Sequence, residues 1–270
     1  SVMRDKSCRK ELNSMWNLIK SEWKKIRLPV LASAFLLTTA ACVLSTTLYK
    51  SYTLQYNLDA WEIGTEIFSL LFPLFVVMPL CWNLYYERRN NFILYVLPRV
   101  PAKKYLGAKW LVYALSAFFM LFVPYLLSAL CALYINPPVP LNASAGNAAF
   151  DHVFLNAFTQ TPLLYALLLS CWKGIIGILV MSLGFALSMY LKNIFVILTG
   201  PFVYVMLENF VLSILQLAQY RLVVAFEPTC ISSDAVSGGS FFAGPALLAA
   251  GIFLTVFFLK KVRKYTVVTV

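Results

Sequence analysis

The stretch ERRNNFILYVLPRVPAKKYLGAK, from Glu87 to Lys109, lies between two long apolar segments and is rich in positive charge. Positive charge concentrated beside apolar spans is typical of the cytoplasmic side of a membrane. Its apolar run, residues 92–97, has the length of a short helix, which Pro98 and Pro101 would end. We therefore expect a short helix along the cytoplasmic face, basic at its ends and apolar in the middle. Such a helix is a docking surface for a cytoplasmic partner.

The order of residue types in this stretch is specific. Glu87 closes one apolar segment, a polar pair and the short apolar helix follow, and after Pro98 the next segment opens with aromatic-Leu-Gly-x-Lys, ending at Lys109. This order resembles the first cytoplasmic loop of type-two ABC transporter permeases, the membrane halves of ATP-driven exporters. Asn90-Asn91 stands where that family often has Gly-Thr. An ordinary basic loop without a partner would need neither the acid nor the prolines.

In that family the loop is the coupling helix, which sits in a groove of the ATPase subunit. The resemblance implies that this chain works with a separate cytoplasmic ATPase, which binds ATP and Mg, and with a second permease subunit, identical or different. It also implies the bacterial plasma membrane as location. The ATPase-coupling residues that it implies are Glu87, Arg88, Arg89, Asn90, Asn91, Phe92, Leu94, Tyr95, Leu97, Pro98 and Arg99.

The composition independently indicates a membrane protein. Hydrophobic residues make up 61% of the 270 residues and charged residues only 12%, whereas a soluble domain carries about 25% charged residues. A membrane span needs about 20 apolar residues, so the chain has room for six spans and little else. We expect an all-α membrane protein with six transmembrane helices and the lipid bilayer as partner. The net charge of +11 does not indicate nucleic acid, because the cations are confined to particular loops.

The spans are expected to follow an amphipathic helix at residues 1–28. Between Glu11 and Arg27, apolar side chains recur at three- and four-residue steps, and lysines occupy the other side. This pattern is typical of an elbow helix lying in the headgroup plane, although a flexible basic tail is the alternative. The transmembrane domain, residues 29–270, then contains the coupling loop at 87–109. Five spans are expected at about 29–49, 64–86, 106–134, 194–217 and 243–259.

The region 161–191 is longer than one span requires and leaves two arrangements open. In one, the span runs from Trp172 to Leu191, and Phe154–Cys171 is a re-entrant or outer-leaflet helix before it. In the other, a single tilted helix begins at Pro162, with Lys173 a third of the way along. Segments 50–63, 136–160 and 218–242 then lie on the outer side.

The distribution of cations predicts the orientation. Of the 22 lysines and arginines, all except Lys50, Lys173 and Arg221 fall on one side when both termini are placed together. Because cations accumulate on the cytoplasmic side, we expect both termini to be cytoplasmic.

Charged residues inside membrane spans are costly and are candidates for function. Here they are Glu66 at the outer start of the second span, Lys173, and Glu208 in the fifth span. We consider them candidates for the substrate pathway, with Lys173 and Glu208 as possible ion-pair partners. The alternative is that they lie at the membrane interface, where charge costs little.

No catalytic or metal-binding pattern is found in the sequence. His152 is the one histidine, and the six cysteines are scattered without CxxC spacing. Only Cys230 lies clearly outside by the predicted topology, so a disulfide within the chain is not expected. A GxxxxGK[ST] loop is missing, so ATP would have to be hydrolysed by a partner subunit. We therefore expect a chain that is not itself an enzyme and carries no cofactor or metal.

Together these features predict the membrane-spanning permease of an ATP-driven exporter. The resemblance points to hydrophobic or amphipathic peptides as cargo, which suits apolar, aromatic-rich walls. An ion- or proton-coupled secondary transporter is the alternative and would need buried polar residues or inverted repeats. A lipid-modifying enzyme of the membrane would need a cluster of acids, His or Lys at one leaflet, which the sequence does not offer.

Overall fold

The computed structural model describes residues 2–51, 54, 56–96, 98, 100–136, 154–232, 236 and 238–262; side chains are described from Met15 onward, except at 49, 51, 93, 94, 155 and 262. This part of the chain is helical and contains no strand. Six long helices have the length and apolar composition to cross a membrane. The prediction of an all-helical fold with six helices able to span a membrane is thus confirmed for the described residues.

The long helices are α1 (Val2–Thr47), α2 (Asp59–Arg89), α4 (Ala102–Tyr134), α6 (Pro162–Tyr190), α7 (Ile194–Ile214) and α9 (Gly238–Val262). Short helices connect them: η1 (Leu48–Ser51), α3 (Phe92–Val96), α5 (Leu155–Gln160), η2 (Ala218–Tyr220), α8 (Leu222–Phe226) and η3 (Pro228–Cys230). Local signals account for several helix ends. Pro162 opens α6 at a position where its missing N–H costs nothing. The Asn193 side chain accepts a hydrogen bond from the Phe195 N–H, 3.0 Å, and caps α7.

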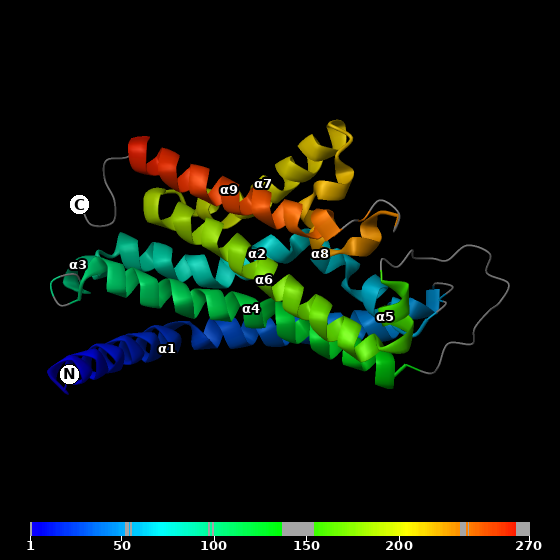
Figure 1. Ribbon diagram of the computed structural model, residues 1–270, viewed down its shortest axis with the longest axis horizontal. Helices are drawn as coiled ribbons and strands as arrows, with labels where there is room; N and C mark the ends of the chain where they lie inside the picture. The colour runs from blue at the N-terminus through cyan, green and yellow to red at the C-terminus, as the bar shows by residue number, and fades with distance from the viewer. Residues whose placement is uncertain are drawn as a thin grey trace.

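The long helices form an elongated bundle (Figure 1). Helix α4 packs between α1 and α6, and α2 packs against α1, α6 and α7, while α9 covers α6 and the short α8. The bundle therefore has two ends. We call the end that carries α3 the loop end; the start of α1 and the end of α9 also lie there (Figure 1). The opposite end, with α5 and the start of α6, is the far end.

The structure corrects the predicted boundary between an elbow helix and the first span. Helix α1 continues through Pro29 without a break, so residues 2–28 are not a separate helix. A proline inside a helix removes one backbone hydrogen bond. The buried positions of α1 nevertheless form one stripe on both sides of it: Glu22, Ile26, Val30, Leu37, Ala41 and Ser45. Packing of this stripe against α4 and α2 keeps α1 continuous at a position where proline disfavours a helix.

The structure distinguishes between the two arrangements left open for 161–191. Helix α6 runs uninterrupted from Pro162 to Tyr190, with Lys173 a third of the way along. The residues before it form only the six-residue α5. One long helix is therefore the correct description, and a re-entrant helix over 154–171 is not.

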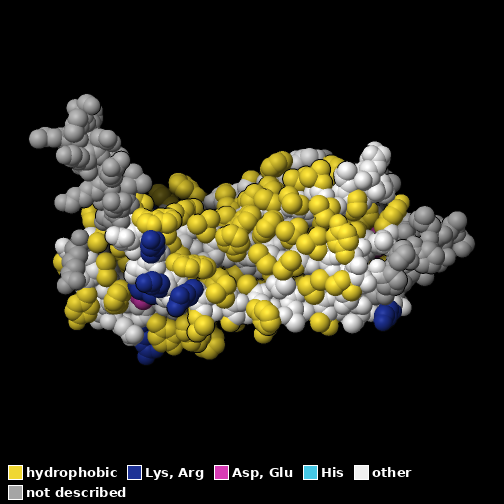
Figure 2. Space-filling view, turned by 90° about the horizontal axis from the view of Figure 1, so that it is seen from below, with side chains coloured by type: hydrophobic (Ala, Val, Ile, Leu, Met, Phe, Trp, Pro, Cys, Tyr) yellow, Lys and Arg dark blue, Asp and Glu magenta, His cyan; other side chains and the backbone are white. Residues whose placement is uncertain are grey.

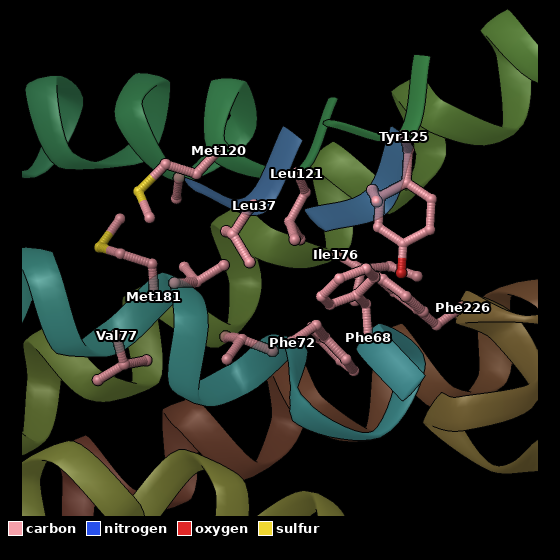
Figure 3. Packing of buried hydrophobic residues seen from close by; sticks show 14 of the residues in the cluster. Leu37, Phe68, Phe72, Val77, Met120, Leu121, Tyr125, Ile176, Met181 and Phe226 are labelled. Carbon is pink, nitrogen blue, oxygen red and sulfur yellow. The ribbon is translucent and has the colours of Figure 1, made fainter. Parts of the chain in front are cut away.

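Part of the predicted outer segment 218–242 instead enters the bundle. From Leu222 to Pro228 nearly every side chain is buried, including Phe226 and Glu227. The Phe226 ring stacks on Phe72 of α2, with centroids 4.1 Å apart, and meets Tyr125 of α4 edge-on (Figure 3). Gly244 of α9 allows this close approach, since a Cβ there would lie 2.6 Å from the Leu222 Cα. The apolar LVVAF run thus completes the core at the far half of the bundle.

Candidate functional site

The loop between α2 and α4 is built as a tight turn, a short helix and a second turn. Asn91 follows α2 with φ 56°, a left-handed conformation that Asn tolerates better than most residues. Helix α3, Phe92–Val96, comes next, and the Val100 N–H bonds to the Val96 carbonyl at 3.1 Å. Pro101 then stands at the N-cap of α4. The predicted short helix is confirmed, and it projects at the loop end (Figure 1).

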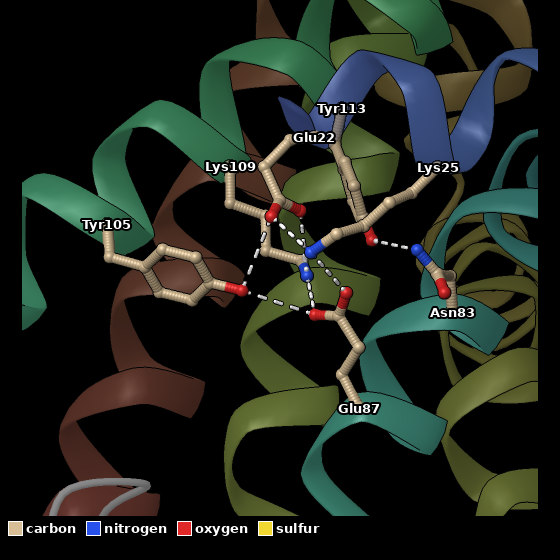
Figure 4. Close-up of polar contacts among 7 residues, drawn as sticks. All are labelled: Glu22, Lys25, Asn83, Glu87, Tyr105, Lys109 and Tyr113. Atoms are coloured by element: carbon tan, nitrogen blue, oxygen red, sulfur yellow. Dashed lines mark hydrogen bonds and ion pairs between the residues drawn. The ribbon is translucent and has the colours of Figure 1, made fainter. Parts of the chain in front are cut away.

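Beneath this loop lies a group of four charged residues and a tyrosine, mostly buried, that we call the anchor cluster: Glu22, Lys25, Glu87, Tyr105 and Lys109. Lys109 is fully buried and forms ion pairs with Glu87 and, at 3.1 Å, with Glu22. Lys25 pairs with the same two carboxylates, at 2.6 Å to Glu22 and 2.9 Å to Glu87. Two acids thus share two bases from three helices, α1, α2 and α4 (Figure 4).

Aromatic side chains close the cluster on the α4 side. The Tyr105 hydroxyl lies 3.3 Å from Glu87 and 3.5 Å from Glu22, so its proton can be donated to either carboxylate. The Lys109 ammonium lies 5.6 Å from the Tyr105 ring centre and 5.5 Å from that of Tyr113. A lysine can be buried only if it is paired. The cluster meets this condition and fixes both flanks of the α3 loop onto α1.

The predicted coupling residues separate into two groups. Glu87 belongs to the anchor cluster and Arg88 points inward, donating to the Ser188 and Leu191 carbonyls at 2.8 Å each. Arg88 therefore caps the end of α6. The exposed group is formed by Arg89, Asn90, Asn91, Phe92, Tyr95 and Pro98. The Leu94 side chain, Leu97 and Arg99 lie outside the described residues.

The exposed surface of α3 is aromatic and lies among cations. Tyr95 is 76% exposed and Phe92 41% exposed. The Lys25 ammonium stands 4.6 Å from the Phe92 ring centre, linking the α3 surface to the anchor cluster. Large aromatic residues are enriched in protein interfaces and often supply much of the binding energy there. Here they are exposed on a short helix that is fixed in place. The arrangement can provide a docking surface.

A second buried ion pair lies in the far half of the bundle. Lys173 of α6 is fully buried, and its ammonium lies 2.5 Å from Glu227, which follows α8. Aromatic rings surround the ammonium, with centres at 4.1 Å for Tyr125, 5.1 Å for Phe226 and 5.2 Å for Trp61. The pair fastens the buried segment 222–228 to α6. Trp172 adds a bond from its indole N–H to the Ala225 carbonyl, 2.9 Å.

The predicted pairing of Lys173 with Glu208 is therefore wrong. Glu208 lies on α7, where it accepts the Leu222 backbone N–H at 3.2 and 3.3 Å. Glu66 is exposed on α2. The three predicted pathway residues are not brought together, because Lys173 pairs with Glu227 and Glu208 binds the start of α8.

Sequence reasoning missed Glu22 and Glu227, although each leaves a signal. Glu22 stands three residues after Ile19 and four before Ile26, so it lies on the apolar stripe rather than the polar side. Glu227 directly follows the apolar run LVVAF. An acid on an apolar surface needs a buried cation, and this criterion would have selected both.

An apolar cavity of about 350 Å³ opens at the far end. It lies between α5, the first turns of α6, η3 and α9. Its walls are Phe154, Ala157, Thr161, Leu164, Tyr165, Leu168, Leu169, Trp172, Pro228 and Phe241. Two of the wall residues, Trp172 and Pro228, are adjacent in the chain to Lys173 and Glu227, which do not themselves line the cavity.

Comparison of the chain with protein-family models, with curated proteins and with solved structures finds no match. Among the residues whose side chains are described, no group of three or more His, Cys, Asp and Glu is placed to hold a metal ion.

Proposed function

We propose that this chain is the membrane-spanning permease subunit of an ATP-driven ABC exporter. Helix α3 would dock a separate cytoplasmic ATPase, which binds ATP and Mg, and carry its movement into the bundle. Hydrophobic or amphipathic peptides are the proposed cargo.

One observation supports this proposal: α3 presents exposed aromatic residues, and the ion pairs of the anchor cluster fix the two ends of its loop. Glu87 lies in the last turn of α2 and Lys109 in the third turn of α4, so the anchor cluster binds the chain on both sides of the loop. Through Glu22 and Lys25 the same cluster contacts α1. A force applied to α3 would therefore reach three helices at once. A loop that served only to connect two helices would not need the anchor cluster.

The proposed orientation rests on the cations of the loop end. Figure 2 shows Lys and Arg side chains gathered at one end of a face that is otherwise largely hydrophobic. Exposed cations at the loop end include Lys20, Lys24, Arg27, Arg89, Lys103, Lys104, Lys192, Lys260 and Lys261. By the positive-inside rule this end faces the cytoplasm, in the proposal the cytoplasm of a bacterial cell. An ATPase would be found on that side.

The exposed outer helices and the far-end cavity are compatible with a second permease subunit and an apolar cargo. Within the most apolar 18 residues of each helix, half of the residues are buried in α2, α4 and α6, whereas 22% or less are buried in α1, α7 and α9. The outer helices can thus contact lipid and a second subunit. The apolar cavity at the far end supports a hydrophobic rather than a charged cargo.

The test is co-purification of the full chain with ATPase subunits of its own host, comparing Tyr95→Ala with Tyr134→Ala. Both tyrosines are about equally exposed, 76% and 74%, but Tyr134 ends α4 at the far end. If Tyr95 is an interface hot spot, its truncation should cost about 2 kcal/mol of binding, more than tenfold in affinity. The unaltered chain and Tyr134→Ala should both recover a P-loop ATPase and its vanadate-sensitive hydrolysis.

The proposal fails if no P-loop ATPase accompanies the unaltered chain in mild detergent. It also fails if Tyr95→Ala and Tyr134→Ala recover the ATPase equally. Size-exclusion profiles of the two variants provide the folding control, since both changes are at the surface.

The buried Lys173–Glu227 pair favours a second candidate, an ion- or proton-coupled transporter. Titratable groups buried within membrane spans often belong to proton relays, and Glu62 of α2 lies within electrostatic range of both members. This candidate predicts proton uptake by liposomes that contain the chain alone, without ATP. Uptake that is abolished by Glu227→Gln would favour it over the exporter.

A further inference from the structure

The far ends of α1 and α4 bring two thiols into contact. The Sγ atoms of Cys42 and Cys131 lie 3.3 Å apart, although 89 residues separate them in the chain. Both residues are free cysteines and both are partly exposed. The two cysteines belong to different predicted spans, and a disulfide within the chain is not expected from the sequence. Only the packing of α1 on α4 brings them together.

The surrounding contacts hold this register. Three residues beyond Cys42, the Ser45 carbonyl accepts a hydrogen bond from the Asn136 side chain of the α4 end, at 3.2 Å. Small buried residues, Ala41 on α1 and Ala132 on α4, flank the two cysteines. Small residues allow helices in a membrane to approach closely. The two thiols therefore face each other because the helices are fixed on either side of them.

The pair also lies close to the end of the bundle. Cys42 is five residues before the end of α1 and Cys131 three residues before the end of α4. At a rise of about 1.5 Å per residue, they lie roughly 8 Å and 5 Å from those ends. Because both cysteines are partly exposed and near helix ends, we expect small reagents to reach both sulfurs.

We propose that Cys42 and Cys131 are a disulfide-forming site that links α1 to α4 at the far end. A disulfide bond is about 2.0 Å long, so a small side-chain rotation from the present contact is sufficient. The oxidant is another disulfide or a diazene. One thiolate attacks it to give a mixed species, and the second thiolate then attacks the bound sulfur, forming the S–S bond and displacing the reduced oxidant. Two protons leave the thiols, and two electrons reduce the oxidant to a dithiol or a hydrazine.

The experiment treats membranes containing the full chain with the diazene diamide and blocks the remaining thiols with N-ethylmaleimide in SDS. Mass spectrometry of the digest, with and without reduction, then identifies linked peptides. We expect a peptide pair joining residues 42 and 131 and the loss of two free thiols per chain. Cys42→Ser and Cys131→Ser should each abolish it, while Cys171→Ser should leave it unchanged.

A matched control moves the thiol by one position, combining Cys42→Ser with Val43→Cys. Val43 is 52% exposed and lies about 100° around the helix from Cys42, more than a quarter of a turn, so this variant should not bridge to Cys131. The proposal is overturned if both native thiols stay free after diamide. It is equally overturned if the shifted thiol bridges as readily as Cys42, or if Cys131 links only to another chain. The outcome does not depend on the ATPase, so it is independent of the proposed transport function.

Discussion

Lys109 at the loop end and Lys173 in the far half are both fully buried, yet they are held in different ways. Lys109 shares two carboxylates with a second cation, Lys25, whose side chain is 29% exposed. Lys173 has Glu227 as its close carboxylate partner and three aromatic rings around it. The loop end therefore has charges that can exchange partners near solvent, whereas the far pair is closed. In the proposed exporter, the loop end would transmit movement, whereas the far pair fastens the buried segment 222–228 to α6.

Replacement of Lys173 is the strongest test of the difference between the two ends. Lys173→Met should destabilise the protein by about 3–5 kcal/mol, because Glu227 is left as an uncompensated buried charge. The double variant Lys173→Met/Glu227→Met should recover most of the loss, since two apolar side chains replace a buried pair. Thermal unfolding in detergent measures both, with the exposed Lys192→Met as control. A loss below about 1 kcal/mol in the single variant would contradict the closed-pair description.

The corresponding change at the loop end should have a smaller effect. Lys109→Met should cost about 2 kcal/mol, within the range for a hydrogen bond to a charged group, because Lys25 still neutralises part of the acid pair. Lys25→Met and Lys109→Met should then be more damaging together than their sum, with a coupling energy of about 0.5 kcal/mol or more. A double-mutant cycle of unfolding measures this. Strict additivity would show that the two lysines do not share the carboxylates.

Substitution of one glycine at each end by alanine compares how tightly the two ends are packed. Gly64 of α2 lies against the α1 backbone, and a Cβ there would be 2.5 Å from the Ser45 Cα. Gly64→Ala should cost about 1–3 kcal/mol through overpacking. Gly107 of α4, at the loop end, has nothing within 4 Å of its Cβ position, so Gly107→Ala should be neutral or stabilise the helix by up to about 1 kcal/mol. Equal unfolding temperatures for the two variants would refute the close contact at Gly64.

The smallest effect is expected for Arg88. Arg88→Gln removes a cation from the carbonyls of Ser188 and Leu191 at the end of α6, which should cost about 1 kcal/mol. Arg89→Gln, next to it and exposed, should change stability by less than about 0.5 kcal/mol. Unfolding curves of the pair distinguish an inward cap from a surface charge, and a reversed order would place Arg88 on the outer surface instead.

The six long apolar helices and the short helix between the second and the third of them could be predicted from the sequence, because both depend on local properties. Apolar runs of sufficient length indicate spans whatever they pack against. The prolines at 98 and 101 and the apolar residues before them likewise indicate a short helix. The alternative starting at Pro162 correctly describes α6, since proline is favoured at the first position of a helix.

The partners of buried charges could not be predicted in the same way. Glu208 was one possible partner for Lys173, but the partner is Glu227, and the continuity of α1 through Pro29 depends on packing against α4 and α2. Which acid reaches a buried lysine, or which thiol meets Cys42, depends on how helices distant in the chain are packed. Hydropathy and spacing determined that six apolar helices form and where their cations accumulate. Only the tertiary structure decided the contacts, because pairing across helices is a property of distance in space and not along the chain.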